Sequence, residues 1–327
     1  MTGTSPIGMA VPAPRPGSAD RIRAFASRYA ILLFLAAVVV AGGVAAPGFL
    51  SGSNLTNMLM QFVPLGIVVI GQTFVILVRG LDLSVASVMA TAAVAATAFG
   101  GVNADAPAVF ATAIGIGAAV GLVNGLLVTK RNVSPFLATL ATMIVLQGIR
   151  FAWTQGAPSG NVPPIFRTIG AGTFNGIPYN VLFLLVVAAA GAAALHLSGF
   201  GRRLYITGGN PLTAHLVGIR AARVTLAAYV VSGVLAAIAG LVLAGFVGVV
   251  DNFVGRGFEL DSIVAAVVGG VALSGGKGTI AGALTGAAIL VAISNLVVML
   301  GLPVQAQIIL KGIVIIVAAS FYVARRR

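Results

Sequence analysis

Residues 224–247 read VTLAAYVVSGVLAAIAGLVLAGFV, a stretch of 24 residues without a charged side chain. As an α helix this stretch would extend about 36 Å, which exceeds the roughly 30 Å thickness of the hydrocarbon core of a bilayer. Helix is the structure expected here, because lipid offers no partner to an unpaired backbone N–H or C=O group. The stretch therefore predicts a transmembrane helix.

The rest of the chain has the same character. Of its 327 residues 59% are hydrophobic and 8% are charged, and 43 glycines lie largely within the apolar runs. Soluble domains carry about 25% charged residues, and glycine within apolar runs is typical of closely packed membrane helices. The sequence predicts an all-α polytopic membrane protein with about ten transmembrane helices, at residues 29–45, 60–78, 84–99, 107–128, 135–155, 179–197, 224–247, 262–273, 279–300 and 304–323.

The charge distribution predicts the orientation. The chain has 19 Lys and Arg residues against six acidic ones, spread between apolar segments rather than gathered with aromatic residues as in a nucleic-acid binder. With the N-terminus in the cytoplasm, 15 of the 19 basic residues fall on the cytoplasmic side, as the positive-inside rule expects. We expect both termini in the cytoplasm, a disordered tail at 1–28 rich in Pro, Gly and Ser, a membrane domain at 29–323, and a basic end at 324–327.

Some chemistry is excluded. The chain has no cysteine, which excludes a disulfide framework. It has two histidines, His196 and His215, which are too few for a three-histidine zinc centre. The stretch SGGKGT at 274–279 lacks the Ser or Thr that must follow Lys277 in a phosphate-binding loop. We therefore expect no metal or cofactor on this chain, and any ATP chemistry must come from a partner.

Polar side chains within the predicted spans leave two interpretations open. Most are expected to join helices by hydrogen bonds, and a minority could line the route of a neutral hydroxylated solute. No acidic residue falls in the middle of a predicted span, which weighs against an ion-coupled secondary transporter. Lys311 is either a contact in a polar pathway or a side chain that reaches toward the interface. The pathway candidates are Gln72, Thr73, Asn124, Thr139, Thr142, Gln147, Asn295 and Gln305.

The two shortest predicted spans begin alike, with LDLSVASV at 81–88 and LDSIVAAV at 260–267. They are the third and the eighth span, an odd offset, so the second copy would enter the membrane from the opposite side. Short segments in matching positions of two halves are typical of inverted repeats. Each pair of an Asp and a Ser, Asp82 with Ser84 and Asp261 with Ser262, is expected to cap the helix that follows. The alternative is that both segments are re-entrant or broken and do not cross fully.

The longest predicted cytoplasmic connection, residues 199–223, contains its own short helix. Asn210 is a good N-cap, Pro211 is favoured at the first helical position, and Gly218 is suited to the turn that ends the helix. A helix this short is marginal by itself and is expected to pack against something. We expect bulky residues at Gly209 or Gly218 to distort its ends.

Four motifs carry a resemblance to a known family. The loop GRRLYITGGN at 201–210, with GLDLSVAS at 80–87, PFLATLAT at 135–142 and LDSIVAAVVGG at 260–270, resembles the ribose-type permeases of ATP-binding-cassette importers. In that family the second motif has Gly where this chain has Ala86. The matches cover residues 60–300 in the order typical of the family.

The resemblance implies a permease subunit that imports a monosaccharide across the bacterial inner membrane and is not itself an enzyme. Its partners would be a second permease copy, a cytoplasmic ATPase subunit that uses ATP and Mg²⁺, a periplasmic sugar-binding protein and membrane lipid. An ion-coupled carrier of a small polar solute is the alternative. The residues that the resemblance assigns to contact with the ATPase are Arg202, Arg203, Gly208, Gly209, Asn210, Pro211, Leu212, Ala214, His215 and Gly218.

Overall fold

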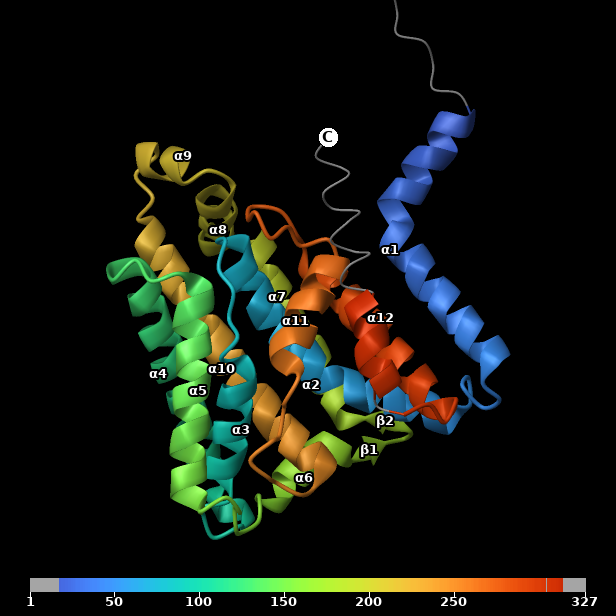
Figure 1. Cartoon of the computed structure of the whole chain (residues 1–327), viewed down its shortest axis with the longest axis vertical. Helices are drawn as coiled ribbons and strands as arrows, with labels where there is room; N and C mark the ends of the chain where they lie inside the picture. Colours follow the sequence, from blue (N-terminus) through green and yellow to red (C-terminus); the bar gives the residue numbers. More distant parts are fainter. Residues whose placement is uncertain (1–17, 304, 314–327) are drawn as a thin grey trace, which may run out of the picture.

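The computed structural model describes residues 18–303 and 305–313 (Figure 1). This part of the chain is helical apart from one two-stranded antiparallel hairpin and the connecting turns. Residues 305–313 form a last helical segment. The elements in chain order are α1 (Ser18–Ala45), α2 (Gly52–Leu77), α3 (Val85–Ala96), η1 (Asn103–Asp105), α4 (Ala106–Lys130), α5 (Pro135–Thr154), α6 (Pro164–Ala171), β1 (Thr173–Phe174), β2 (Ile177–Pro178), α7 (Tyr179–His196), α8 (Gly199–Gly209), α9 (Pro211–Leu216), α10 (Ala221–Val247), α11 (Phe258–Val268) and α12 (Ile280–Met299).

Six helices in the described residues are long and apolar enough to cross a bilayer: α2, α4 with η1, α5, α7, α10 and α12. Each coincides with a predicted span, which confirms a polytopic all-α membrane protein. α1 begins at Ser18, inside the predicted disordered tail. The local reason is a run of good helix formers around Arg21 and Arg23. Residues 1–17, most of the predicted last span and the basic end at 324–327 lie outside the described residues.

Two predicted spans are broken. α3 has 12 residues and α11 has 11, so each helix extends only about 17–18 Å and does not cover the bilayer core by itself. Residues 80–84 lead into α3 without helical structure, and residues 249–257 lead irregularly into α11. The two helices run in opposite directions (Figure 1). Each of the two segments therefore consists of a non-helical part followed by a short helix.

α10 lies at the centre of the bundle, in contact with α2, α3, α4 and α6. α4 approaches it closely because Gly117, Gly121 and Gly125 recur every fourth residue along one face of α4. A Cβ on Gly121 would lie 2.7 Å from the Cα of Val230, and one on Gly125 would lie 3.0 Å from the Cα of Leu226. Such small-residue stripes let membrane helices pack backbone to backbone.

The bundle has two distinct ends (Figure 1). At one end lie α8, α9, the C-terminal end of α2 and the N-terminal end of α1. At the other end lie α6 and the β1–β2 hairpin. α9 projects beyond the ends of α4 and α10, so it is available to a partner outside the bundle.

Candidate functional site

The projecting helix α9 is built as the sequence predicts. The Asn210 side chain accepts hydrogen bonds from the backbone N–H groups of Leu212, at 2.9 Å, and Thr213, at 3.3 Å. Pro211 occupies the first turn, and Gly218 follows the helix with a φ of 74°. Both ends are therefore fixed locally, which compensates for the marginal stability of so short a helix.

α9 exposes two large apolar side chains, and exposed arginines precede and follow it in the chain. Leu212 is 66% exposed and Leu216 is 76% exposed, and they lie one turn apart on the same face. Ala214 is buried toward the rest of the chain. Large exposed apolar side chains gathered on one face indicate an interaction site. The other members of the set assigned by the resemblance divide into Gly208, which is buried, and Arg202, Arg203, Gly209, Asn210, Pro211, His215 and Gly218, which are exposed.

A clamp of hydrogen bonds ties α8 to the membrane helices. The Arg79 guanidinium, just after α2, donates from Nε to the carbonyl of Gly208 at 2.7 Å and from Nη2 to that of Gly209 at 2.8 Å. These carbonyls lie at the negative end of the α8 dipole, where a cation is favoured. Gly276 N donates to the carbonyl of Leu77 at 2.9 Å. α8 is thereby fixed to the end of α2, which is itself joined to the loop between α11 and α12.

The unwound residues 80–84 are the second feature of the site, and polar side chains from three spans satisfy their backbone. The Gln72 amide, oriented to suit its partners, pairs with both the N–H and the C=O of Asp82 at 3.2 Å. Thr139 Oγ1 accepts from Leu83 N at 3.1 Å, and Tyr229 Oη donates to the Leu81 carbonyl at 3.3 Å. Non-helical backbone is tolerated at membrane depth only where it is buried and paired in this way.

Asp82 organises the same break. Its Oδ1 accepts from the N–H and the hydroxyl of Ser84 at 3.0 and 2.6 Å, and its Oδ2 accepts from the Ser232 hydroxyl at 2.8 Å. Asn124 donates to Ser84 Oγ at 2.9 Å, and Thr142 donates to Asn124 Oδ1 at 2.7 Å. Ser232 lies in α10, whereas Gln72 and Thr139, the partners of Asp82 and Leu83, lie near the ends of α2 and α5. The break in the helix therefore brings the fully buried Asp82 inside the bundle.

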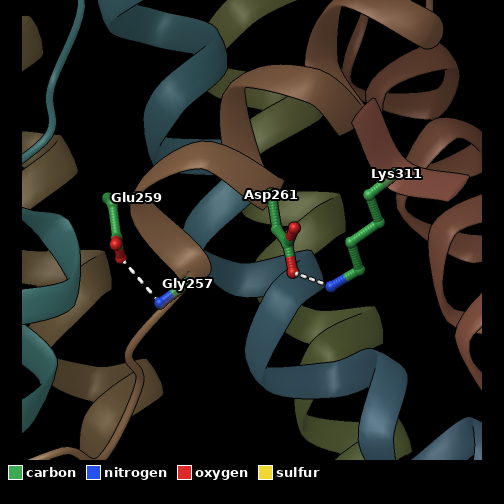
Figure 2. A network of polar contacts seen from close by, with 4 residues as sticks. All are labelled: Gly257, Glu259, Asp261 and Lys311. Carbon is green, nitrogen blue, oxygen red and sulfur yellow. Dashed lines mark hydrogen bonds and ion pairs between the residues drawn. The ribbon is translucent and has the colours of Figure 1, made fainter. Parts of the chain in front are cut away.

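The capping prediction needs correction. Ser84 precedes α3 but makes no side-chain cap, because its hydroxyl binds Asp82. α11 begins at Phe258, three residues before Asp261. Gly257 precedes it with a φ of 98°, a conformation that glycine adopts readily. Glu259 reaches back to the Gly257 N–H at 2.8 Å (Figure 2). Asp261 and Ser262 therefore lie inside the helix and do not cap it.

Asp261 has another partner. Lys311 Nζ lies 2.6 Å from Asp261 Oδ2, and their side chains are 23% and 19% exposed. Figure 2 shows the carboxylates of Glu259 and Asp261 leaving α11 in different directions. Lys311 is thus paired with a carboxylate, an arrangement that neither interpretation of Lys311 from the sequence named.

The remaining pathway candidates do not meet in one place. Thr73 bonds to the Val69 carbonyl in its own helix at 2.7 Å, and Asn295 pairs reciprocally with Asn54 at 2.9 and 3.0 Å. Gln305 is exposed on the last helical segment. These contacts match the helix-joining interpretation, and Gln147 alone among the candidates lines the cavity described next.

A cavity of about 310 Å³ lies between α3, α5 and the chain that enters α11. This volume is at the lower end of the range for small-molecule pockets, about 300–1,000 Å³. Its lining combines the first turns of both broken helices with the second half of α5. The lining residues are Ala86, Ser87, Ala90, Met143, Gln147, Arg150, Asn252, Phe253, Val254, Arg256 and Glu259.

Arg150 and Asn252 connect the walls of this cavity. Arg150 Nη1 donates to the Ser87 carbonyl and to Thr91 Oγ1, both at 3.2 Å, and Nη2 donates to the Asn252 carbonyl at 2.9 Å. Asn252 Nδ2 donates to Thr154 Oγ1 at 2.9 Å. Arg150 is 4% exposed and Asn252 2%, yet Arg150 Nε and Asn252 Oδ1 have no hydrogen-bond partner among the described residues. Leaving such groups unpaired costs about 1–3 kcal/mol each.

Sequence reasoning missed this pair. Arg150 interrupts the apolar stretch LQGIRFAW at 146–153, and a charge at that place in a span is a signal of a functional site. Asn252 lies in a loop with no comparable signal, because only the fold brings it to α5.

Comparisons with known proteins place the chain among transport permeases. Residues 54–319 match the family model described as branched-chain amino acid transport system / permease component. The ribose import permease protein of Bacillus subtilis strain 168 is 38% identical over 292 residues, 88% of this chain and 89% of that one. The ribose import permease protein of Escherichia coli K12 is 36% identical over 291 residues, 88% of this chain and 90% of that one. The galactose/methyl galactoside import permease protein of Haemophilus influenzae is 32% identical over 311 residues, 89% of this chain and 92% of that one.

No solved structure matches the chain. The family match covers most of the chain, including both broken segments and α8–α9. With its apolar helices, the chain is a multi-pass membrane protein and a transport component rather than an enzyme. It belongs to the family of permease components of branched-chain amino acid transport systems.

Proposed function

We propose that this chain is the transmembrane permease subunit of an ATP-binding-cassette importer that moves a monosaccharide, ribose or a related sugar, across the inner membrane. The relatives with 32–38% identity are import permeases for ribose and for galactose or methyl galactoside. ATP and Mg²⁺ act in a partner ATPase, and a periplasmic sugar-binding protein delivers the cargo.

The observation that carries the proposal is the projecting α9. An apolar helix face fits a hydrophobic groove in a partner, and the exposed Leu212 and Leu216 supply that face. The arginines around α9 call for an acidic rim on the groove, since complementary charge fixes orientation. These arginines are Arg202, Arg203, Arg220 and Arg223, all exposed.

The clamp gives this surface a route into the membrane. A displacement of α9 moves α8, and α8 is bound through Arg79 to the end of α2. Arg79 is directly followed by the unwound residues that lead to α3. Tyr205 adds a contact to the Gly278 carbonyl at 2.7 Å, and burial raises the pKa of its phenol, which keeps it a donor. Closure of the ATPase would therefore reach both broken helices.

The proposal includes ten crossings in an inverted repeat, with both termini in the cytoplasm. The opposite directions of α3 and α11 support the repeat. The N-terminal end of α1 lies at the same end as α9, as do the basic residues of α8 and of the start of α10. That end would be cytoplasmic by the positive-inside rule.

A second permease copy completes the proposed assembly. α5, which forms one wall of the cavity, exposes apolar side chains on its other faces, and a second copy or lipid would cover them. The exposed large apolar side chains of α5 are Phe136, Leu137, Ile144, Val145, Ile149 and Trp153.

The buried Asp82 gives the alternative, an ion-coupled carrier, one observation in its favour. Three donors already occupy the carboxylate oxygens, however, and they hold the break in place. A proton uncoupler applied at constant ATP separates the two functions. Sugar uptake should continue, and its collapse would favour the ion-coupled carrier.

The chain has no cysteine, so single cysteines report topology without background. Leu212→Cys should react with a membrane-impermeant maleimide only in inverted vesicles, and the matched variant Phe174→Cys, in the hairpin at the opposite end, only in intact spheroplasts. Labelling of Leu212→Cys from outside would overturn the assignment of α9 to the ATPase.

A further inference from the structure

The loop between α10 and α11 is fastened to the end of α5 at two consecutive residues, Asn252 and Phe253. The Asn252 side chain donates to Thr154 Oγ1 at 2.9 Å and to the Gly156 carbonyl at 3.0 Å. The Phe253 ring meets the ring of Phe151 edge-on, with centroids 5.7 Å apart. We call this set of contacts the loop latch.

Arg150 holds the latched loop to a second helix. Its guanidinium donates to the Asn252 carbonyl at 2.9 Å and to the Ser87 carbonyl, in the first turn of α3, at 3.2 Å. The planar fork of an arginine can hold two such acceptors at once, whereas a lysine offers one compact ammonium on a flexible stem. The next residue but one, Val254, is buried in one apolar cluster with Ala90 of α3. The loop is therefore held against both α5 and α3.

The loop itself has no regular structure to keep it in place. Residues 249–256 form neither helix nor strand. Gly248 ends α10 with a φ of 80°, and Gly257 precedes α11 with a φ of 98°. A few residues at the ends of elements commonly absorb the backbone change of a moving segment. The two glycines are suited to that role, so the latch contacts decide where the loop lies.

The latch is not fully satisfied. Arg150 Nε and Asn252 Oδ1 have no hydrogen-bond partner among the described residues, and both atoms are shut off from solvent while the loop is latched. Release of the loop would let water pair with them, which offsets part of the hydrogen bonds that release breaks. The latched and released states are therefore expected to be close enough in free energy for an external event to switch between them.

We propose that the loop latch is a conformational switch on the cavity between α3, α5 and the chain entering α11. Residues 252–254 form one wall of this cavity, and their release widens it toward the end of the bundle that carries α6, opposite to α9 (Figure 1). The inference rests on the proposed function, in which the α6 end is periplasmic. Release of the latch is then the step that opens the permease to a sugar delivered from outside.

The first experiment measures whether the loop covers α3, in the complete importer in nanodiscs. The chain has no cysteine, and Ala90 lines the cavity but is only 1% exposed. Modification of Ala90→Cys by a water-soluble methanethiosulfonate should be slow. Adding Asn252→Ala or Arg150→Lys should speed it about tenfold or more, because each change removes hydrogen bonds of the loop. The control Ala236→Cys, a fully buried position of α10, should stay slow in both backgrounds.

The second experiment keeps the latch closed. Thr154→Cys together with Asn252→Cys replaces a bonded pair of side chains by two thiols, which copper phenanthroline can join. Sugar uptake by the oxidised double variant should fall about tenfold or more relative to its reduced form, and dithiothreitol should restore it. Each single variant, treated with the same oxidant, is a matched control and should keep its uptake.

The outcomes separate the latch from the importer assignment. Unchanged reactivity of Ala90→Cys in both latch variants, or equal gains at Ala90→Cys and Ala236→Cys, overturns the latch. Full uptake by the cross-linked importer overturns it as well, and neither result touches the importer assignment. A wild-type complex in which no sugar stimulates ATP hydrolysis overturns the proposed function, while the reactivity of Ala90→Cys still decides whether the loop is latched.

Discussion

Replacing Gly208 by alanine should uncouple the importer. A Cβ on Gly208 would overlap the carbonyl oxygen of Leu77 and lie 2.7 Å from Gly276 N, which are the two atoms of the hydrogen bond that joins α2 to the loop after α11. Both contacts are to backbone, which cannot turn aside as a flexible side chain could. α8 must therefore move away from α2.

The size of the effect follows from what that movement breaks. Overpacking of a close contact costs about 1–3 kcal/mol. The Leu77–Gly276 bond adds about 1 kcal/mol, and the charged donor Arg79 adds about 1.5–3 kcal/mol for its bonds to Gly208 and Gly209. Together these contributions predict a loss of about 3.5–7 kcal/mol in the contacts that hold α8. A tenfold change in the equilibrium between attached and detached α8 requires only about 1.4 kcal/mol, which is less than half of this expected loss.

The assay is sugar uptake per ATP hydrolysed in proteoliposomes. Gly208→Ala should lower this ratio at least about tenfold while α9 still binds the ATPase, because Asn210 and the rest of α9 are unchanged. Gly209→Ala is the matched control, because nothing lies within 4 Å of the position of its Cβ. The structure therefore predicts that substitution by alanine disturbs coupling at Gly208 and not at Gly209. Equal coupling in Gly208→Ala and the wild type, or equal loss in both variants, would refute the reasoning. Arg79→Lys tests the clamp if Gly208→Ala fails to fold.

Three further sets of substitutions test the fold. Gly121→Leu should prevent folding, because α4 and α10 are in contact at Gly121, and the monodisperse size-exclusion peak should be lost. The control Gly115→Leu places its side chain where nothing lies within 4 Å and should behave as the wild type. A folded Gly121→Leu variant would contradict the packing of α4 on α10. Asp82→Ala should destabilise by about 2–4 kcal/mol in thermal unfolding, since it strands buried donors on Ser84 and Ser232, and Asp82→Asn should cost less because one acceptor remains; the reverse order would show that charge, not hydrogen bonding, matters. Lys311→Gln and Asp261→Asn should each cost about 1–2 kcal/mol, with the double variant no worse than either; additive losses would mean that the two residues act independently.

The sequence was most informative where local chemistry decides the structure. Long apolar runs can only be helices in lipid, so five of the six spans were placed within a few residues, and the predicted span at 60–78 begins eight residues after the start of α2. Asn210, Pro211 and Gly218 act within one helix and were correctly assigned to its ends. α8, in contrast, was expected as part of a loop, because its glycines and its low apolar content hide a helix that is stabilised by Arg79 and the end of α2.

The roles of the polar residues could not be predicted from the sequence where they depend on contacts between distant parts of the chain. Gln72, Asn124, Thr139 and Thr142 come from three different spans, and their common role at the unwound residues 80–84 depends on how those spans pack. The burial of Asp82 inside the bundle could not be predicted without knowing that the helix is interrupted before it. The role of Asn252 likewise could not be predicted, because it depends on contact with Arg150, about a hundred residues earlier in the chain.

The clamp on α8 has a consequence for how such a subunit could diversify. Arg79 and the Gly276 N–H grip main-chain carbonyls only, so the attachment takes no account of which side chains α9 displays. Substitutions on the exposed face of α9 can therefore adapt the subunit to a different ATPase, in evolution or by design. The hydrogen bonds that transmit the displacement of α8 to the membrane helices need not change.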